Sequence, residues 1–172
     1  MNPTGKVMLN YGAMSGLCSF VFFLMLQGMG WNALGQASLL GSWIPVVFIC
    51  LATGKLRDHF LGGFITYGQA FRLGFLTACS GAFLFALILY IYGTAVNHEL
   101  IEVYKSDVLE DLEKTKSILN DTIYEASMES LDKTTMFTIA SSAFFSKTFG
   151  GLLVSLITAG FYRRTPMIQD QE

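Results

Sequence analysis

Four long apolar stretches, separated by shorter polar segments, run along the chain. They cover residues 7–28, 34–53, 70–93 and 136–162. A helix needs about 20 residues to cross a hydrocarbon core about 30 Å thick, and each stretch reaches that length. Pro45 interrupts the second stretch, but membrane helices tolerate proline where neighbours satisfy the freed carbonyl. The pattern therefore predicts an all-α membrane protein, a four-transmembrane-helix bundle that forms a single integral membrane domain over residues 1–172.

One polar segment, residues 96–133, separates the third apolar stretch from the fourth. Apolar residues recur at helical spacing through residues 100–112, and acidic residues fill the other faces. As one straight helix the segment would be about 50 Å long, yet both of its ends must meet the same membrane face. Thr122 and Glu125 have the spacing of a capping box, which marks a helix start. We therefore expect an extramembrane helical hairpin whose turn lies near Asn120.

Composition and charge support this prediction and limit the classes of function. Hydrophobic residues make up 52% of the chain and charged residues only 14%, against roughly 25% in soluble domains. Ten of the thirteen acidic residues lie in residues 96–133 beside four lysines, so that segment carries a net charge of −6. This asymmetry is typical of a membrane protein with one translocated acidic segment. No basic patch with interleaved aromatic residues occurs, so we expect the lipid bilayer and not nucleic acid as a partner.

The orientation in the membrane follows from lysine and arginine. Apart from Lys147 in the fourth apolar stretch, those outside the acidic segment occur in the N-terminal tail, the second connection and the C-terminal tail, but not in the first connection. They are Lys6, Lys55, Arg57, Arg72, Arg163 and Arg164. Cytoplasmic segments of membrane proteins carry an excess of basic residues. We therefore expect both termini in the cytoplasm and residues 96–133 on the non-cytoplasmic side.

Small residues at four-residue spacing mark the helix-packing faces of three spans. Lipid tails compete with leucine, so helices associate in membranes where small residues let their backbones approach closely. The residues are Gly12 and Gly16 in the first span, Gly74, Ala78, Ala82 and Ala86 in the third, and Gly151, Ser155 and Ala159 in the fourth. We expect these faces to pack within one chain. A homo-oligomer formed through one of them is the alternative.

The second connection mixes basic and aromatic residues over a short stretch. We expect it to lie as an interfacial loop among lipid headgroups, with Gly62 and Gly63 as a flexible break. Its basic members are Lys55, Arg57 and Arg72. Residues 62–75, GGFITYGQAFRLGF, resemble the signature segment of a bacterial inner-membrane family known as domain of unknown function 4199.

That resemblance covers essentially the whole chain. Members of the family have four predicted spans, an acidic insertion before the last span and a basic end similar to residues 162–166 of this chain. The resemblance implies a fold and a location in the bacterial inner membrane. Because the family has no established activity, it implies no reaction.

Few residues offer catalytic or metal-binding chemistry. His98 and Glu102 lie one turn apart, but a third and a fourth metal ligand are not identifiable. Cys18, Cys50 and Cys79 fall inside apolar stretches and are expected to act as small hydrophobic residues. Since no catalytic constellation occurs, we expect a protein that is not an enzyme and has no cofactor or bound metal.

Lys147 is the candidate polar residue within a span, where a charge is costly. If the fourth span begins near Met136, Lys147 lies at mid-membrane and lines a polar cavity or pairs internally. If the span begins near Phe144, Lys147 lies at the outer interface and snorkels to water. The length of the remaining apolar stretch favours snorkelling.

Two functions are compatible with these features. In the first, the protein is a non-enzymatic interaction or assembly component whose acidic hairpin binds an envelope protein. The simpler interpretation is that the hairpin is a solvated spacer and not a docking surface. In the second, the protein is a small-molecule permease or channel component in which Lys147, Asn10 and Gln27 line a polar path.

Overall fold

The computed structural model describes residues 2–116 and 120–164, apart from the side chain of Gln36. Over these residues the chain is helical, with six α-helices and one 3-10 helix. Four stretches are long and apolar enough to cross a membrane, which confirms the predicted fold class at this level. They are α1 (Pro3–Gly28), the second stretch (Ala37–Phe60), α3 (Tyr67–Ala95) and α6 (Met136–Tyr162).

The second stretch begins with a 3-10 helix, η1 (Gln36–Gly41), and continues as α2 (Trp43–Phe60). The helix therefore continues beyond Thr53, the end of the predicted range 34–53. Pro45 lies in the first turn of α2, where a missing backbone N–H needs no partner within the helix, so it starts this helix and does not interrupt it.

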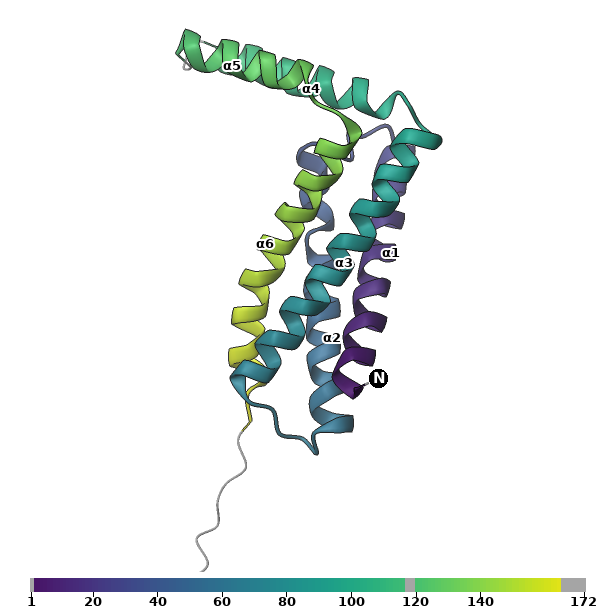
Figure 1. Ribbon diagram of the computed structural model, residues 1–172, viewed down its shortest axis with the longest axis vertical. Coiled ribbons are helices and arrows are strands. Elements are labelled where there is room, and N and C mark those ends of the chain that lie inside the picture. Colours follow the sequence, from purple (N-terminus) through teal and green to yellow (C-terminus); the bar gives the residue numbers. More distant parts are fainter. Residues whose placement is uncertain (1, 117–119, 165–172) are drawn as a thin grey trace, which may run out of the picture.

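Helix α3 is the centre of the bundle. It packs against α1, α2 and α6, and α2 contacts each of the other three spans. Leu73, Thr77 and Leu89 on α3 are completely buried. Figure 1 shows α6, α3 and α1 side by side with α2 behind them.

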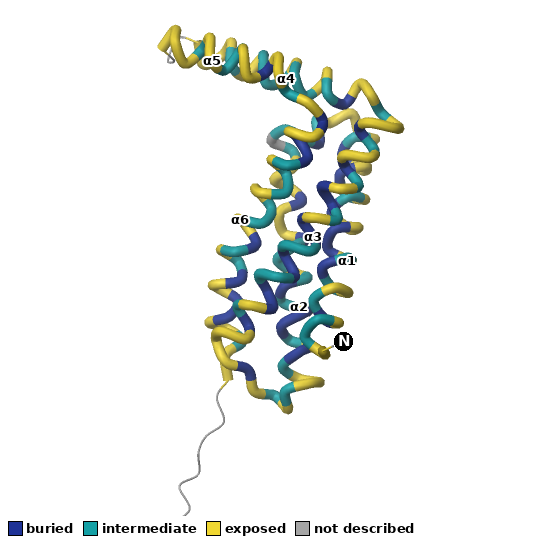
Figure 2. The backbone as a smooth tube through the Cα atoms, viewed as in Figure 1, coloured by how far each residue is buried: buried dark blue, intermediate teal, exposed yellow. Residues whose placement is uncertain are grey.

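The outer surface of the bundle is apolar. Large hydrophobic side chains on the outside of α1, α3 and α6 are exposed, including Met25, Phe83 and Phe161, the last with 83% of its surface accessible. Figure 2 shows buried residues recurring along the four long helices, whereas the two short helices at one end are mostly exposed. A soluble protein rarely exposes so continuous an apolar surface, whereas lipid covers one without cost.

The predicted small residues lie at helix contacts. A Cβ atom built on Gly16 would lie 2.7 Å from the carbonyl oxygen of Gly81, and one on Gly74 would lie 2.9 Å from Ser155 Oγ. Gly12 faces Ser80 of α3 at similarly close range. The other members are all buried: Ala78, Ala82, Ala86, Gly151 and Ala159.

Two shorter helices, α4 (Leu100–Thr115) and α5 (Asp121–Asp132), lie across one end of the bundle and reach past α6 (Figure 1). We call this pair the arm, and the end that carries it the arm end. Asn120 caps α5, since its side chain accepts a hydrogen bond from the backbone N–H of Thr122. The predicted capping box at Thr122 was therefore wrong by two residues. Residues 117–119, beside the predicted turn, lie outside the described residues.

The opposite end of the bundle carries the basic residues, and we call it the basic end. Ile65 and Arg164 exchange two backbone hydrogen bonds of 3.0 Å, which fasten the second connection to the end of α6. Gly62 and Gly63 lie in that connection with φ angles of 62° and 88°, which favour glycine. The predicted interfacial loop is shorter than expected, because Lys55 and Arg57 belong to α2 and Arg72 to α3. Long basic side chains can reach the membrane interface from the end of a helix. A basic residue near the interface therefore does not require the helix to end before it.

Candidate functional site: a lysine-lined cavity beneath the arm

A cavity of about 510 Å³ lies in the half of the bundle nearest the arm. Helix α1, η1, the start of α2 and residues 139–154 of α6 form its walls. Phe85 of α3 and Tyr104 of α4 also line it. Its size is within the range of pockets that hold small molecules, roughly 300–1,000 Å³.

Lys147 lines this cavity from α6. The helix begins at Met136, where Thr135 caps it by accepting a hydrogen bond from the backbone N–H of Thr138. Lys147 is therefore about 16 Å from the start of a helix that rises 1.5 Å per residue. Its Nζ lies 4.3 Å from the ring centroid of Phe85, so the side chain turns into the bundle. This orientation differs from the favoured snorkelling geometry, in which the span begins near Phe144 and Lys147 reaches the outer interface.

Small polar side chains make the cavity both roomy and partly hydrophilic. Ser142, Ser146 and Gly150 follow one another at four-residue spacing on the face of α6 that lines it. Ser38 and Ser42 line the wall contributed by η1 and its C-terminal end. Among the described residues that line the cavity there is no carboxylate, so the ammonium of Lys147 has no acidic partner there.

The cavity opens between α6 and the second stretch. Leu39 and Ser42 on one side are exposed, as are Ser146 and Gly150 on the other. Within the described part of the chain, a Cβ atom built on Gly150 would meet no atom within 4 Å. Because these residues lie in candidate spans, the opening faces laterally, in the direction that lipid would occupy.

Toward the basic end the bundle is packed closely. Gly151 faces Ala78, and one turn further along α6 Ser155 faces Gly74. Ile49 of α2 is 1% exposed, and its side chain lies 3.0 Å from a Cβ built on Gly74 and 4.0 Å from one built on Gly151. The cavity is therefore closed on the side that faces the basic end of the bundle, which we call its inner end.

The other polar residues expected to join Lys147 in a path do not line the cavity. Asn10 is exposed on α1, nine residues before Ser19, where the cavity wall on that helix begins. Gln27 is half-buried near the end of α1, and within the described part of the chain its Oε1 has no hydrogen-bond partner.

The arm is held together by contacts between its two helices. Lys105 Nζ donates a hydrogen bond of 3.0 Å to the carbonyl of Asp132, and Lys116 Nζ lies 4.9 Å from the ring centroid of Tyr124. The first contact joins the start of α4 to the end of α5 and the second joins their other ends, so the helices are antiparallel. Leu100 and Leu131 are buried at the base of the arm.

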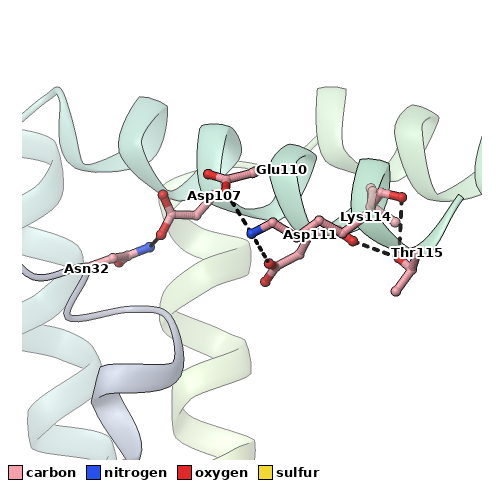
Figure 3. A network of polar contacts seen from close by, with 7 residues as sticks. Asn32, Asp107, Glu110, Asp111, Lys114 and Thr115 are labelled. Atoms are coloured by element: carbon pink, nitrogen blue, oxygen red, sulfur yellow. Dashed lines mark hydrogen bonds and ion pairs between the residues drawn. The ribbon is translucent and has the colours of Figure 1, made fainter.

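One polar contact fastens the arm to the loop beside the cavity. The side-chain amide of Asn32 donates a hydrogen bond to Asp107 of α4 (Figure 3). The side-chain oxygen Oδ1 of Asn32 also accepts from the backbone N–H groups of Leu34 and Gly35, which orders the loop that leads into η1. Further along α4, Lys114 bonds Glu110 at 2.7 Å, and this hydrogen bond raises the pKa of Lys114 above its ordinary value.

The remaining candidates do not come together as a site. His98 is exposed, and among the described residues no three His, Cys, Asp or Glu side chains group as metal ligands would. The three cysteines are free thiols within α1, α2 and α3.

Sequence reasoning missed the serine-lined face of α6 and the role of Asn32. The spacing of Ser142, Ser146 and Gly150 was visible, as was Thr135 immediately before an apolar run, which is a helix-start signal. Together they would have placed Lys147 well inside a helix with a polar face.

Fold and site define the class of this protein as a helical-bundle membrane protein with four candidate spans and a lysine in its interior. The comparison with protein families then identifies the group to which it belongs. The chain is a member of the family described as "Protein of unknown function (DUF4199)", whose model matches residues 10–164. No curated protein and no solved structure matches the chain.

Proposed function

We propose that this protein is a non-enzymatic component of the bacterial inner membrane whose arm binds the basic surface of another envelope protein. The observation that carries the proposal is the position of the arm, which reaches past the bundle at the end opposite to the basic residues (Figure 1). An arm attached to the bundle at its base leaves most of its surface free for a partner.

The charge of the arm supports a basic partner. Lys114 and Lys133 bond carboxylates of their own helices, at Glu110 and Glu129. Acidic residues on both arm helices carry no ion pair to a described residue, among them Glu113, Asp121 and Glu125. Because residues 96–133 have a net charge of −6, the arm presents a negative field that would attract and orient a positively charged surface.

Apolar side chains on the arm would supply contact area. Ile123 at the far end is 56% exposed and Val103 on α4 is 46% exposed. Interfaces combine such apolar contacts with a charged rim. A solvated spacer would need only the charged residues and not these exposed apolar side chains.

Photocrosslinking tests this proposal. A photoreactive amino acid at Ile123 is expected to form an adduct with a basic envelope protein in intact cells, whereas one at Phe161, exposed on α6 near the basic end, is expected to label only lipid. Substituting Asp121, Glu125 and Glu129 by lysine should abolish the Ile123 adduct. Adducts with lipid alone would support the spacer, and adducts with a second copy of the chain would support a homo-oligomer; either result would refute the proposal.

The proposed orientation has both termini in the cytoplasm and the arm on the non-cytoplasmic side. Six basic residues at the end opposite to the arm support it: Lys6, Lys55, Arg57, Arg72, Arg163 and Arg164. With the three native cysteines replaced by alanine, an Asp121→Cys variant should react in whole cells with a thiol reagent that does not cross the inner membrane. Reaction only after the inner membrane is opened would reverse the orientation.

A small-molecule permease or channel component is the second candidate, favoured by the position of Lys147 in the cavity. Against it, Asn10 and Gln27 lie outside that cavity, and the packing of Gly151 against Ala78 closes the inner end. Deletion of residues 107–133 should remove an interaction function and leave transport, whereas Lys147→Leu should remove transport.

A further inference from the structure

We infer that the cavity beneath the arm binds an amphiphile with a single anionic headgroup, a carboxylate or a phosphate, whose hydrocarbon chain leaves through the lateral opening. This ligand site is distinct from the proposed docking function of the arm.

The first argument is the uncompensated charge of Lys147. A lysine within a span normally pairs with an acid or reaches the interface, because lipid does not solvate it. Lys147 does neither, since its Nζ turns over Phe85 and the described cavity lining contains no carboxylate. The ring stabilises a cation but leaves it charged. An anionic group in the cavity would neutralise it.

The second argument is the supply of hydrogen-bond donors around that charge. Ser142 and Ser146 line the cavity from the same helix as Lys147, and Ser38 and Ser42 line the facing wall. Hydroxyl groups donate to carboxylate and phosphate oxygens, which have several lone pairs each. One lysine with several hydroxyls matches one anionic group better than it matches a cation.

The third argument is the apolar remainder of the cavity and the direction of its mouth. Phe22, Leu26, Pro45, Val46 and Val154 line the cavity along with the polar groups. The exposed residues at its edge, Leu39 and Gly150, lie within candidate spans, so a ligand enters from the bilayer. On the arm side Tyr104 covers the cavity and is itself half-buried. A free ion would gain little from this arrangement, whereas an amphiphile would keep its chain in lipid.

The test uses the full-length protein in phosphatidylcholine nanodiscs and two photoactivatable probes of equal chain length. One is a fatty acid and the other is the corresponding fatty alcohol, each with a diazirine in the chain. The fatty acid is expected to label residues of α6 and the second stretch around the cavity, and the alcohol to label them weakly. Lys147→Met should weaken fatty-acid labelling about tenfold to a hundredfold, the range expected for loss of a charge-assisted hydrogen bond. Lys147→Arg should preserve it.

Two controls separate this result from unfolding and from general attraction to positive charge. Lys55→Met removes an exposed lysine of α2 outside the cavity and should leave the labelling unchanged. Ser146→Ala should reduce it without altering the melting temperature.

Three outcomes would overturn the inference. Equal labelling by the acid and the alcohol in the wild-type protein would show that the headgroup charge is not recognised, and this comparison needs no variant to fold. Full competition by millimolar inorganic phosphate would show that the site takes a free anion and not an amphiphile. Labelling that Lys147→Met leaves unchanged would place the headgroup elsewhere. Because the arm is intact in every variant, Ile123 crosslinking in the same proteins reports on the docking proposal separately.

Discussion

At the scale of single residues, the packing of the bundle depends on glycine positions, where the absence of a side chain lets two helices approach closely. Gly16 on α1 lies so close to the backbone of α3 that even a methyl group would meet the Gly81 carbonyl oxygen. Ser155 is completely buried between α6 and α3, and its hydroxyl donates a 2.6 Å hydrogen bond to Gly151 of its own helix. A leucine side chain gains no hydrophobic free energy when it moves from lipid into a helix contact. Close contacts between helices therefore supply the packing energy.

Gly16→Ala is therefore expected to destabilise the protein, whereas the same change at Gly160 is not. The added Cβ at Gly16 must displace backbone, which costs about 1–3 kcal/mol in overpacked cores. Gly160 lies on α6 with no atom of a described residue within 4 Å of a built Cβ, so alanine there should stabilise the helix slightly. Thermal unfolding in detergent measures both. Equal melting temperatures for the two variants would contradict the structure at the α1–α3 contact.

At the scale of elements, the sequence predicts helices well where lipid imposes their length and less well where a local signal decides their ends. Four spans followed from apolar runs of about 20 residues, because a shorter run leaves backbone polar groups in hydrocarbon. The predicted second stretch ends at Thr53 because Lys55 and Arg57 have the charge of loop residues, whereas helix α2 continues to Phe60. The cavity could not be predicted, since it arises only when η1 and α6 are placed opposite each other.

The start of α5 gives an element-scale prediction. Asn120→Ala should destabilise the first turn of α5 by about 1 kcal/mol, the usual cost of losing a capping side chain. Thr122→Ala should have little effect, because in the structure the Thr122 backbone N–H and not its hydroxyl makes the capping contact. Amide hydrogen exchange at residues 122–125 would detect the difference. Faster exchange in the Thr122 variant alone would support the capping box at Thr122 that the sequence suggested.

At the scale of the whole molecule, the arm and the cavity are neighbours. Tyr104 belongs to the arm and lines the cavity, and Asp107, one turn further along α4, bonds Asn32 in the loop that leads to η1. The same loop residue orders the backbone at Leu34 and Gly35. A partner that moves α4 would therefore act on both the cover of the cavity and one of its walls.

The position of the arm should depend on Asp107. Removing its carboxylate in Asp107→Ala leaves the Asn32 amide without its acceptor, and the arm should then sample a wider range of positions relative to the bundle. Asp107→Asn keeps an oxygen that accepts from Asn32 and should retain the wild-type position. Asp111→Ala removes a carboxylate of the same helix that pairs with Lys114 and, among the described residues, with no other cation, so it is the matched control.

Spin labels on Glu113 of α4 and Phe149 of α6, both exposed, would measure this distribution by double electron–electron resonance in a cysteine-free background. A broadened distribution in Asp107→Ala alone is the expected result. If Asp111→Ala broadens it equally, the arm responds to its overall charge and the bond to Asn32 does not hold it. If neither variant changes it, the buried contacts of Leu100 and Leu131 at the base are sufficient to fix the arm.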